Sequence, residues 1–114
     1  MTRIFAFVLV LALVGAAPTP AASDASVVDE LAAQYFQHEL ATDYSLRSEI
    51  GKPIDTIRPI TYENAQTDAT FAQSAMDRLK TIQPAKLDHA RSITLSNLRY
   101  LAGNEVANAK YFWL

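Results

Sequence analysis

The sequence predicts an all-α protein with about three helices in a small antiparallel arrangement, preceded by a signal peptide. Apolar residues recur at three- and four-residue steps in three segments, which is the period of amphipathic helices. No segment alternates β-branched and polar residues as a half-buried strand would. Gly51, Pro53 and Pro84 interrupt the helical pattern, and the short connections they leave favour antiparallel neighbours.

Residues 1–23 have the layout of a secretory signal peptide. Arg3 supplies an early positive charge, Ile4 to Val14 is uninterruptedly apolar, and a small-residue region with two prolines follows. We expect cleavage after Ser23 or after Ala22. The alternative is a retained anchor, but the apolar run is shorter than the roughly 20 residues that span a bilayer.

Residues 24–114 form the expected mature unit, a single helical segment. The whole chain has a formal net charge of −2, and loss of Arg3 makes the remainder more acidic, so we expect no nucleic-acid partner. The absence of cysteine excludes disulfides, thiol catalysis and thiolate metal sites. These features predict an exported protein, periplasmic or secreted, without a stable membrane span.

The first helix is predicted from about Ser26, as its N-terminal cap, to Glu49. Gly51 and Pro53 end it. Its apolar stripe consists of Val28, Leu31, Ala32, Tyr35, Phe36 and Leu40.

The second helix is predicted from the cap Thr61 to about Ile82, and the third begins at Asp88. We expect Gly103 to mark a close contact or a break, because glycine costs about 1 kcal/mol relative to alanine in a helix. The second stripe contains Ala65, Ala69, Ala72, Met76, Leu79 and Ile82, and the third contains Ile93, Leu95, Leu98, Leu101, Ala102, Val106 and Ala109.

The connection between the first two helices contains isoleucine at every third position. Ile54, Ile57 and Ile60 have the spacing expected of a strap laid across a helix pair. The chain then finishes in four large apolar residues, Tyr111 to Leu114, which need a surface to pack against.

His38 and Glu39 form the first half of the zinc-peptidase pattern H-E-x-x-H, in which two histidines one helical turn apart bind zinc. Thr42 stands where the second histidine belongs. A metal site would need His89 from another helix, with Glu39 or Asp43 completing it. The competing interpretation, which we favour, is that both residues are ordinary helix residues, with His38 at the rim of the apolar stripe.

Glu39 falls on the apolar side of its helix. It is expected either to have a partner, for which Arg99 is a candidate, or to face an open groove. No G-x-S-x-G or P-loop motif is present. The aromatic residues are interpreted as core, and the dispersed Arg91, Arg99 and Lys110 as a solvated helix face.

The segment Leu79 to Leu114 resembles the N-terminal region of the bacterial family called domain of unknown function 885. The resemblance rests on a helix that ends in leucine, a short turn, and a helix with a leucine-arginine pair and an aromatic-rich exit. Upstream, the residues DYSLRSEIG replace the Pro-x-x-Ala-Thr that the family places before its glycine. The matching positions are Tyr35, Phe36, Leu40, Gly51, Thr61, Leu79, Ile82, Pro84, Leu87, Leu98, Arg99 and Tyr111.

The resemblance implies a longer, mostly helical, exported protein similar to zinc carboxypeptidases. The family's H-E-x-x-H lies far downstream of this region, so no catalytic, cofactor-binding or metal residue is carried onto this chain. Zinc is implied only for the missing downstream part.

Three functions follow as hypotheses. The leading one is an exported N-terminal helical scaffold segment of a zinc-peptidase-like protein, truncated before its catalytic part and inactive alone. The alternative is a small stand-alone secreted or periplasmic helical protein that binds a partner through Phe112 and Trp113. The third, an enzyme in its own right, depends on His38, His89 and Glu39.

Overall fold

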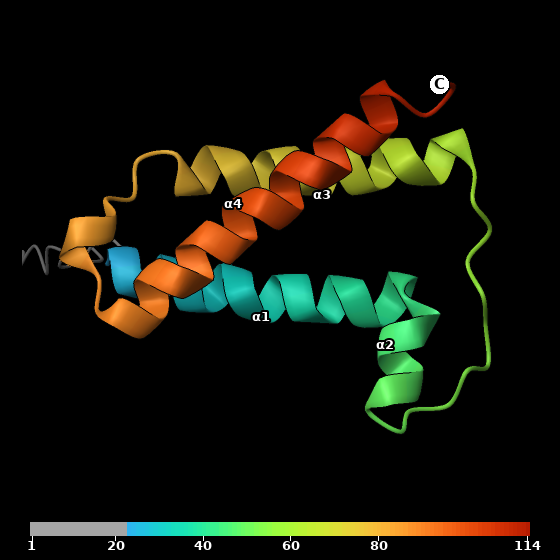
Figure 1. Cartoon of the computed structure of the whole chain (residues 1–114), viewed down its shortest axis with the longest axis horizontal. Helices are drawn as coiled ribbons and strands as arrows, with labels where there is room; N and C mark the ends of the chain where they lie inside the picture. Colours follow the sequence, from blue (N-terminus) through green and yellow to red (C-terminus); the bar gives the residue numbers. More distant parts are fainter. Residues whose placement is uncertain (1–22) are drawn as a thin grey trace, which may run out of the picture.

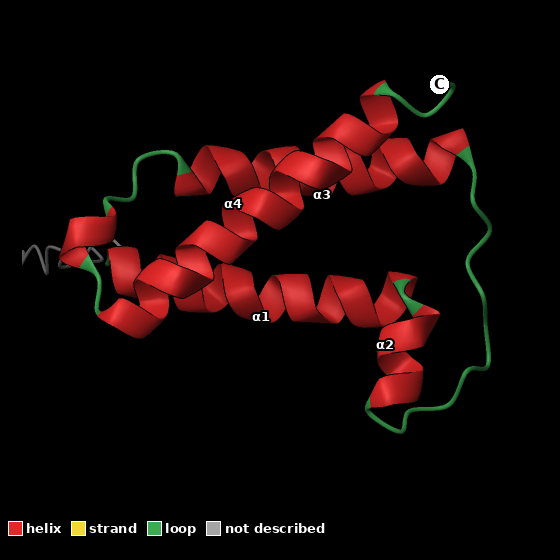
Figure 2. Cartoon of the chain, in the orientation of Figure 1, coloured by secondary structure: helices red, strands yellow, loops and turns green. Residues whose placement is uncertain are grey.

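The structure, a computed structural model, describes residues 23–114, so the predicted signal peptide lies outside the described residues except for Ser23. Within this range every regular element is helical and there is no strand (Figure 2). The elements are α1 (Asp24–Thr42), α2 (Tyr44–Glu49), α3 (Tyr62–Leu79), the 3₁₀ turn η1 (Pro84–Lys86) and α4 (His89–Lys110).

The all-α class is confirmed, with four α-helices in the described range where about three were expected. The additional helix arises at Asp43, where the predicted first helix breaks. Asp43 has an extended backbone, and its Oδ1 accepts hydrogen bonds from the backbone N–H groups of Ser45 and Leu46 at 2.8 and 3.3 Å. An aspartate that caps a new helix in this way ends the preceding one.

The other helix starts depend on capping side chains. The Thr61 hydroxyl accepts from Asn64 N–H, which confirms the predicted cap, and the Asp88 carboxylate accepts from Arg91 N–H, which confirms the predicted start of the third helix. The prediction for α1 was wrong by three residues, because Ser23 is the cap and Ser26 is its donor at 3.2 Å. The second helix also ends earlier than predicted, at Leu79.

Figure 1 shows α4 running across α1 and α3, and the buried residues of these three helices form one core cluster. Each of the three helices contributes three of its own residues. The buried apolar residues are Val28, Leu31, Tyr35, Ala72, Ala75, Leu79, Ile82, Leu95, Leu98 and Ala102. All except Ala75 belong to the apolar stripes predicted from the sequence, although Phe36 and Ile93 of those stripes are largely exposed.

Arg99 anchors α4 to the end of α3. Its Nη2 donates to the carbonyl oxygens of Leu79 and Ile82, both at 2.9 Å. Carbonyls at the end of a helix lack intrahelical donors, so the guanidinium satisfies groups that α3 leaves unpaired. Arg99 therefore does not pair with Glu39, the partner considered from the sequence.

Two expectations, one about a connection and one about the last helix, are wrong. Ile57 and Ile60 are 66% and 94% exposed, so the segment between α2 and α3 does not form an apolar strap. Gly103 lies inside an unbroken α4, and a Cβ at this position would meet no atom within 4 Å. The helix therefore contains glycine without a close contact or a break that requires it.

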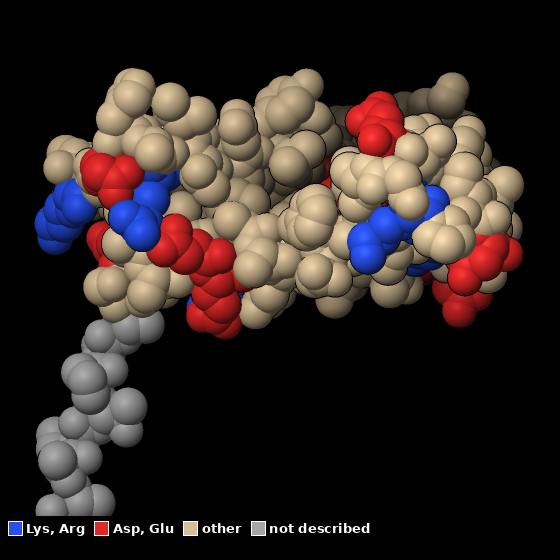
Figure 3. Space-filling model, turned by 90° about the horizontal axis from the view of Figure 1, so that it is seen from below, with Lys and Arg blue, Asp and Glu red and all other residues tan. Residues whose placement is uncertain are grey.

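Arg91 and Arg78 fix the N-terminal part of α1. The Arg91 guanidinium donates to both carboxylate oxygens of Asp29, at 2.9 and 2.8 Å, and Arg78 donates to Glu30 at 3.2 and 3.0 Å. These pairs link α1 to α4 and to α3. On the face drawn in Figure 3, positive and negative side chains lie side by side in this way, with no extended area of one sign.

Within residues 23–114, no helix is both long and apolar enough to cross a membrane.

Candidate functional site

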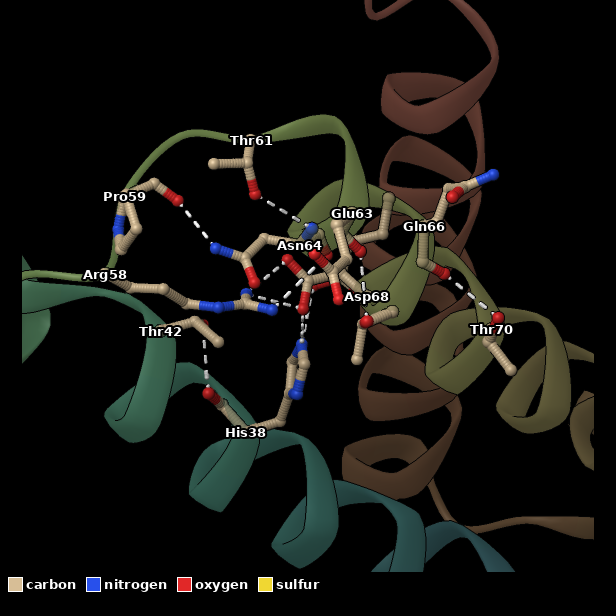
Figure 4. Close-up of polar contacts among 12 residues, drawn as sticks. His38, Thr42, Arg58, Pro59, Thr61, Glu63, Asn64, Gln66, Asp68 and Thr70 are labelled. Atoms are coloured by element: carbon tan, nitrogen blue, oxygen red, sulfur yellow. Dashed lines mark hydrogen bonds and ion pairs between the residues drawn. The ribbon is translucent and has the colours of Figure 1, made fainter.

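A polar junction lies where the later part of α1 faces α3 and α4. It brings together residues that are 30 and 37 positions apart in sequence: His38 from α1, Asp68 from α3 and Glu105 from α4. His38 Nε2 is 3.3 Å from Glu105 Oε1 and 3.5 Å from Asp68 Oδ1. Figure 4 shows the imidazole pointing from α1 toward Asp68.

The position of His38 follows from packing on both sides of its ring. The imidazole stacks on Phe71 with ring centroids 4.2 Å apart, and it meets Tyr35 edge-on at 6.2 Å. Its side chain is 14% exposed, and Nε2 is fully buried without a hydrogen bond of normal geometry to any described residue. The sequence predicted His38 at the rim of the apolar stripe. In the structure its side chain extends from α1 and contacts both α3 and α4.

Arg58 neutralises Asp68. Its Nη1 lies 2.7 Å from each carboxylate oxygen of Asp68, and Nη2 donates to the Asn64 carbonyl oxygen at 3.3 Å. The segment that carries Arg58 is itself held by Asn64, whose Nδ2 donates to the Pro59 carbonyl oxygen at 2.8 Å (Figure 4). Arg58 is therefore directed at Asp68 by the connection that precedes α3.

Among residues 23–114, Glu105 has no lysine or arginine partner equivalent to Arg58. The Tyr35 hydroxyl donates to Glu105 Oε2 at 3.3 Å, but burial and the nearby carboxylates of Glu39 and Asp68 oppose its ionisation. Burial, the largest cause, and these like charges raise the pKa of Glu105 to about 7. Burial and the Glu105 charge also raise the pKa of Tyr35, so its phenol stays protonated and remains a donor.

A pocket of about 610 Å³ opens beside this junction. Asp68 and Glu105 line one part of it, and apolar and aromatic residues near the end of the chain line another. Its full lining is Thr42, Arg58, Pro59, Ile60, Thr61, Asn64, Ala65, Asp68, Glu105, Ala107, Asn108, Tyr111 and Phe112.

An aromatic patch, formed by Ile60, Tyr62, Phe112 and Trp113, adjoins the pocket. Tyr62 lies 5.5 Å from Phe112 and 5.6 Å from Trp113, measured between ring centroids, and Phe112 meets Trp113 edge-on at 4.9 Å. Trp113 remains 78% exposed. These rings contact one another outside the buried core, which corrects the interpretation of all the aromatic residues as core.

His38 and Glu39 do not form a metal site with His89. His89 begins α4, whereas His38 contacts Glu105, 16 residues further along the same helix. At 1.5 Å per residue the separation along α4 is about 24 Å, too far for one ion. No group of three or more His, Asp or Glu side chains in residues 23–114 has the geometry of a metal site.

The sequence did not identify Asp68, Glu105 or Arg58 as site residues. Each is one of many charged residues on helical surfaces or in a connection, and only the crossing of α4 over α1 and α3 brings them together. The sequence contained one indication of this junction: Glu39 lies on the apolar side of its predicted helix, which indicated a buried polar contact there.

Comparisons with protein-family models, curated proteins and solved structures found no match.

Proposed function

We propose that this chain is the exported N-terminal helical scaffold segment of a zinc-peptidase-like protein, and that the aromatic patch docks against the rest of that protein. The resemblance of residues 79–114 to the family supports the origin of the segment. The exposed patch is the structural observation that carries the docking role.

The patch differs from scattered surface apolar residues. Tyr62, Phe112 and Trp113 form one group of rings, and Ile60 and Phe112 line the adjoining pocket together. Isolated apolar side chains are ordinary on a protein surface, whereas grouped ones mark sites of interaction. A covering partner would remove Trp113 and Ile60 from water and gain roughly 25 cal/mol for each Å² of apolar surface buried.

The decisive experiment is to sequence the native transcript through and beyond the codon for Leu114. A frame that continues for several hundred codons and encodes H-E-x-x-H supports the scaffold function. A stop codon directly after Leu114, together with accumulation of the short protein in cells, contradicts it.

In the scaffold role the chain alone hydrolyses no peptide and binds no zinc. Both properties are measurable on the purified 114-residue chain, by assay against mixed peptides and by metal analysis after dialysis. A zinc stoichiometry near one that is lost in His38→Ala would contradict this part of the proposal, and Glu63→Ala, on the exposed start of α3, is the matched control.

A stand-alone partner-binding protein is the second candidate, and the core favours it. α1, α3 and α4 each contribute fully or nearly fully buried residues to one shared cluster, as in a domain that folds by itself. A monomer that melts cooperatively supports this candidate, whereas a chain that aggregates or remains molten supports the severed-segment origin. Trp113 fluorescence reports docking in both cases, because burial shifts its emission to shorter wavelength.

A further inference from the structure

We propose that the polar junction of His38, Asp68 and Glu105 is a proton-responsive joint. With one proton bound, the junction holds the later part of α1 against α3 and α4; when that proton is lost, this part of α1 separates from them. The joint is independent of the scaffold function, because it depends only on contacts within residues 23–114.

The later part of α1 depends on this junction because it has little else to hold it. The buried residues of α1 are Val28, Leu31 and Tyr35, and none follows in the remaining turns or in α2. The two arginine pairs to Asp29 and Glu30 also lie in the early turns. Beyond Tyr35, the ring of His38 stacks on Phe71 of α3 and its Nε2 lies near carboxylates of α3 and α4, so His38 makes the main specific contacts of this part of α1.

The charges at the junction come from every element packed there. Tyr35, His38 and Glu39 belong to α1, Asp68 belongs to α3, and Arg58 reaches Asp68 from the connecting segment. Three carboxylates therefore share the site with one guanidinium. That guanidinium is already bonded to Asp68 and to a backbone carbonyl, so it does not pair with Glu105, whose ionisation the neighbouring Glu39 carboxylate opposes.

Protonation of Glu105 changes the interaction between α1 and α4 from repulsive to attractive. When Glu105 is protonated, the repulsion between Glu105 on α4 and Glu39 on α1 disappears, and the neutral carboxyl can share a hydrogen bond with the neighbouring carboxylate or imidazole. When Glu105 is ionised, like charges face each other across the α1–α4 contact in a partly buried setting. The raised pKa of Glu105, about 7, places the transition near neutral pH.

Spin labels across α1 and α3 test the joint directly. The chain contains no cysteine, so Gln37→Cys on α1 and Gln66→Cys on α3 give one labelled pair on exposed positions of the full chain. We expect a shorter and narrower distance distribution at pH 6 than at pH 8. Identical distributions at the two pH values would overturn the proposal.

Variants in the labelled chain identify the group that carries the proton. Glu105→Gln keeps the size of the side chain and removes its charge, so it should give the pH 6 distribution at both pH values. The control Glu63→Gln, on an exposed part of α3, should respond like the unaltered chain. If Glu105→Gln keeps the full response and His38→Gln abolishes it, the imidazole carries the proton and the assignment to Glu105 is overturned.

Carbon-13 NMR of glutamate-labelled full chain gives an independent readout. The side-chain carboxyl resonance that disappears in Glu105→Gln should titrate with a midpoint near 7. A midpoint near 4.5, the ordinary pKa of glutamate, would overturn the proposal.

Discussion

Arg58 Nη1 lies 2.7 Å from both carboxylate oxygens of Asp68, and this contact attaches an irregular connection to the start of α3. It also supplies the cation that faces the carboxylates of the polar junction. Glu105, on α4, has no guanidinium partner among the described residues: its neighbours are the Tyr35 hydroxyl, the His38 imidazole and the Glu39 carboxylate. At the junction, the negative charge of Asp68 on α3 is therefore neutralised by Arg58, whereas no arginine or lysine among the described residues neutralises Glu105 on α4.

Replacing Arg58 should destabilise the fold. Arg58→Gln leaves Asp68 partly buried without its cation, and hydrogen bonds to charged groups are worth about 1.5 to 3 kcal/mol. Because both side chains are about a quarter exposed, we expect the lower part of this range. Urea denaturation followed by circular dichroism measures the change, with Lys52→Gln in the same connection as control. Equal stabilities of Arg58→Gln and Lys52→Gln would contradict the role given to Arg58.

Glu105→Gln should stabilise the protein at pH 8. The pKa of Glu105 is higher in the folded chain, about 7, than its usual value of 4.5, so the folded state binds the extra proton between these values. The stabilisation that protonation of Glu105 gives the folded state is therefore fully present below about pH 4.5 and is lost as the pH rises through 7. With solvent screening we expect a gain of about 1 kcal/mol at pH 8, or about 4 to 8 °C in melting temperature.

Melting curves of the two proteins at pH 5, 6, 7 and 8 check this prediction. The gain should shrink toward lower pH, because the unaltered side chain then carries its own proton. A melting temperature that falls in Glu105→Gln by the same amount at all four pH values would show that the carboxylate is a favourable partner for His38.

Arg99→Met should weaken the end of α3. The substitution keeps much of the aliphatic stem and removes the two hydrogen bonds to the carbonyl oxygens of Leu79 and Ile82. We expect a loss of about 1 to 3 kcal/mol. Amide exchange should accelerate most in residues 76–88, and uniform acceleration over the whole chain would argue against a local anchoring role.

Asp43→Ala should loosen α2 while leaving the core intact. The carboxylate accepts from Ser45 and Leu46, and loss of such a cap costs about 1 kcal/mol. Since α2 contributes no buried residue, exchange should rise in residues 44–49 with little change at Leu95. Asp43→Asn keeps an acceptor and is the matched control. Faster exchange at Leu95 in Asp43→Ala would mean that α2 supports the core.

Acid should weaken the early part of α1. Hydrogen bonds from Arg91 lower the pKa of Asp29 and Asp88, and those from Arg78 lower the pKa of Glu30. Stability from these lowered groups is present above their unfolded pKa values and is lost as the pH falls through the folded ones. The melting temperature should therefore drop below about pH 4, and less steeply in Asp29→Asn. An identical acid profile in the variant would exclude this contribution.

The sequence by itself determined the fold class, two of the capped helix starts and most of the core. These features are local: a cap such as Thr61 or Asp88 bonds within its own first turn, and an apolar stripe follows from the 3.6-residue period. Errors arose where two local signals competed. Asp43 began a new helix inside a segment that no glycine or proline interrupts before Gly51, and Ser23 replaced Ser26 as the cap of α1.

Only the tertiary structure decided the polar junction and the partner of Arg99. His38, Asp68 and Glu105 lie on three different helices, and their meeting depends on where α4 crosses the other two. Neither spacing within one helix nor composition encodes that crossing, because it follows from how the three apolar faces pack together. The raised pKa of Glu105 has the same origin, since burial and the carboxylates of α1 and α3 produce it only once the helices have assembled.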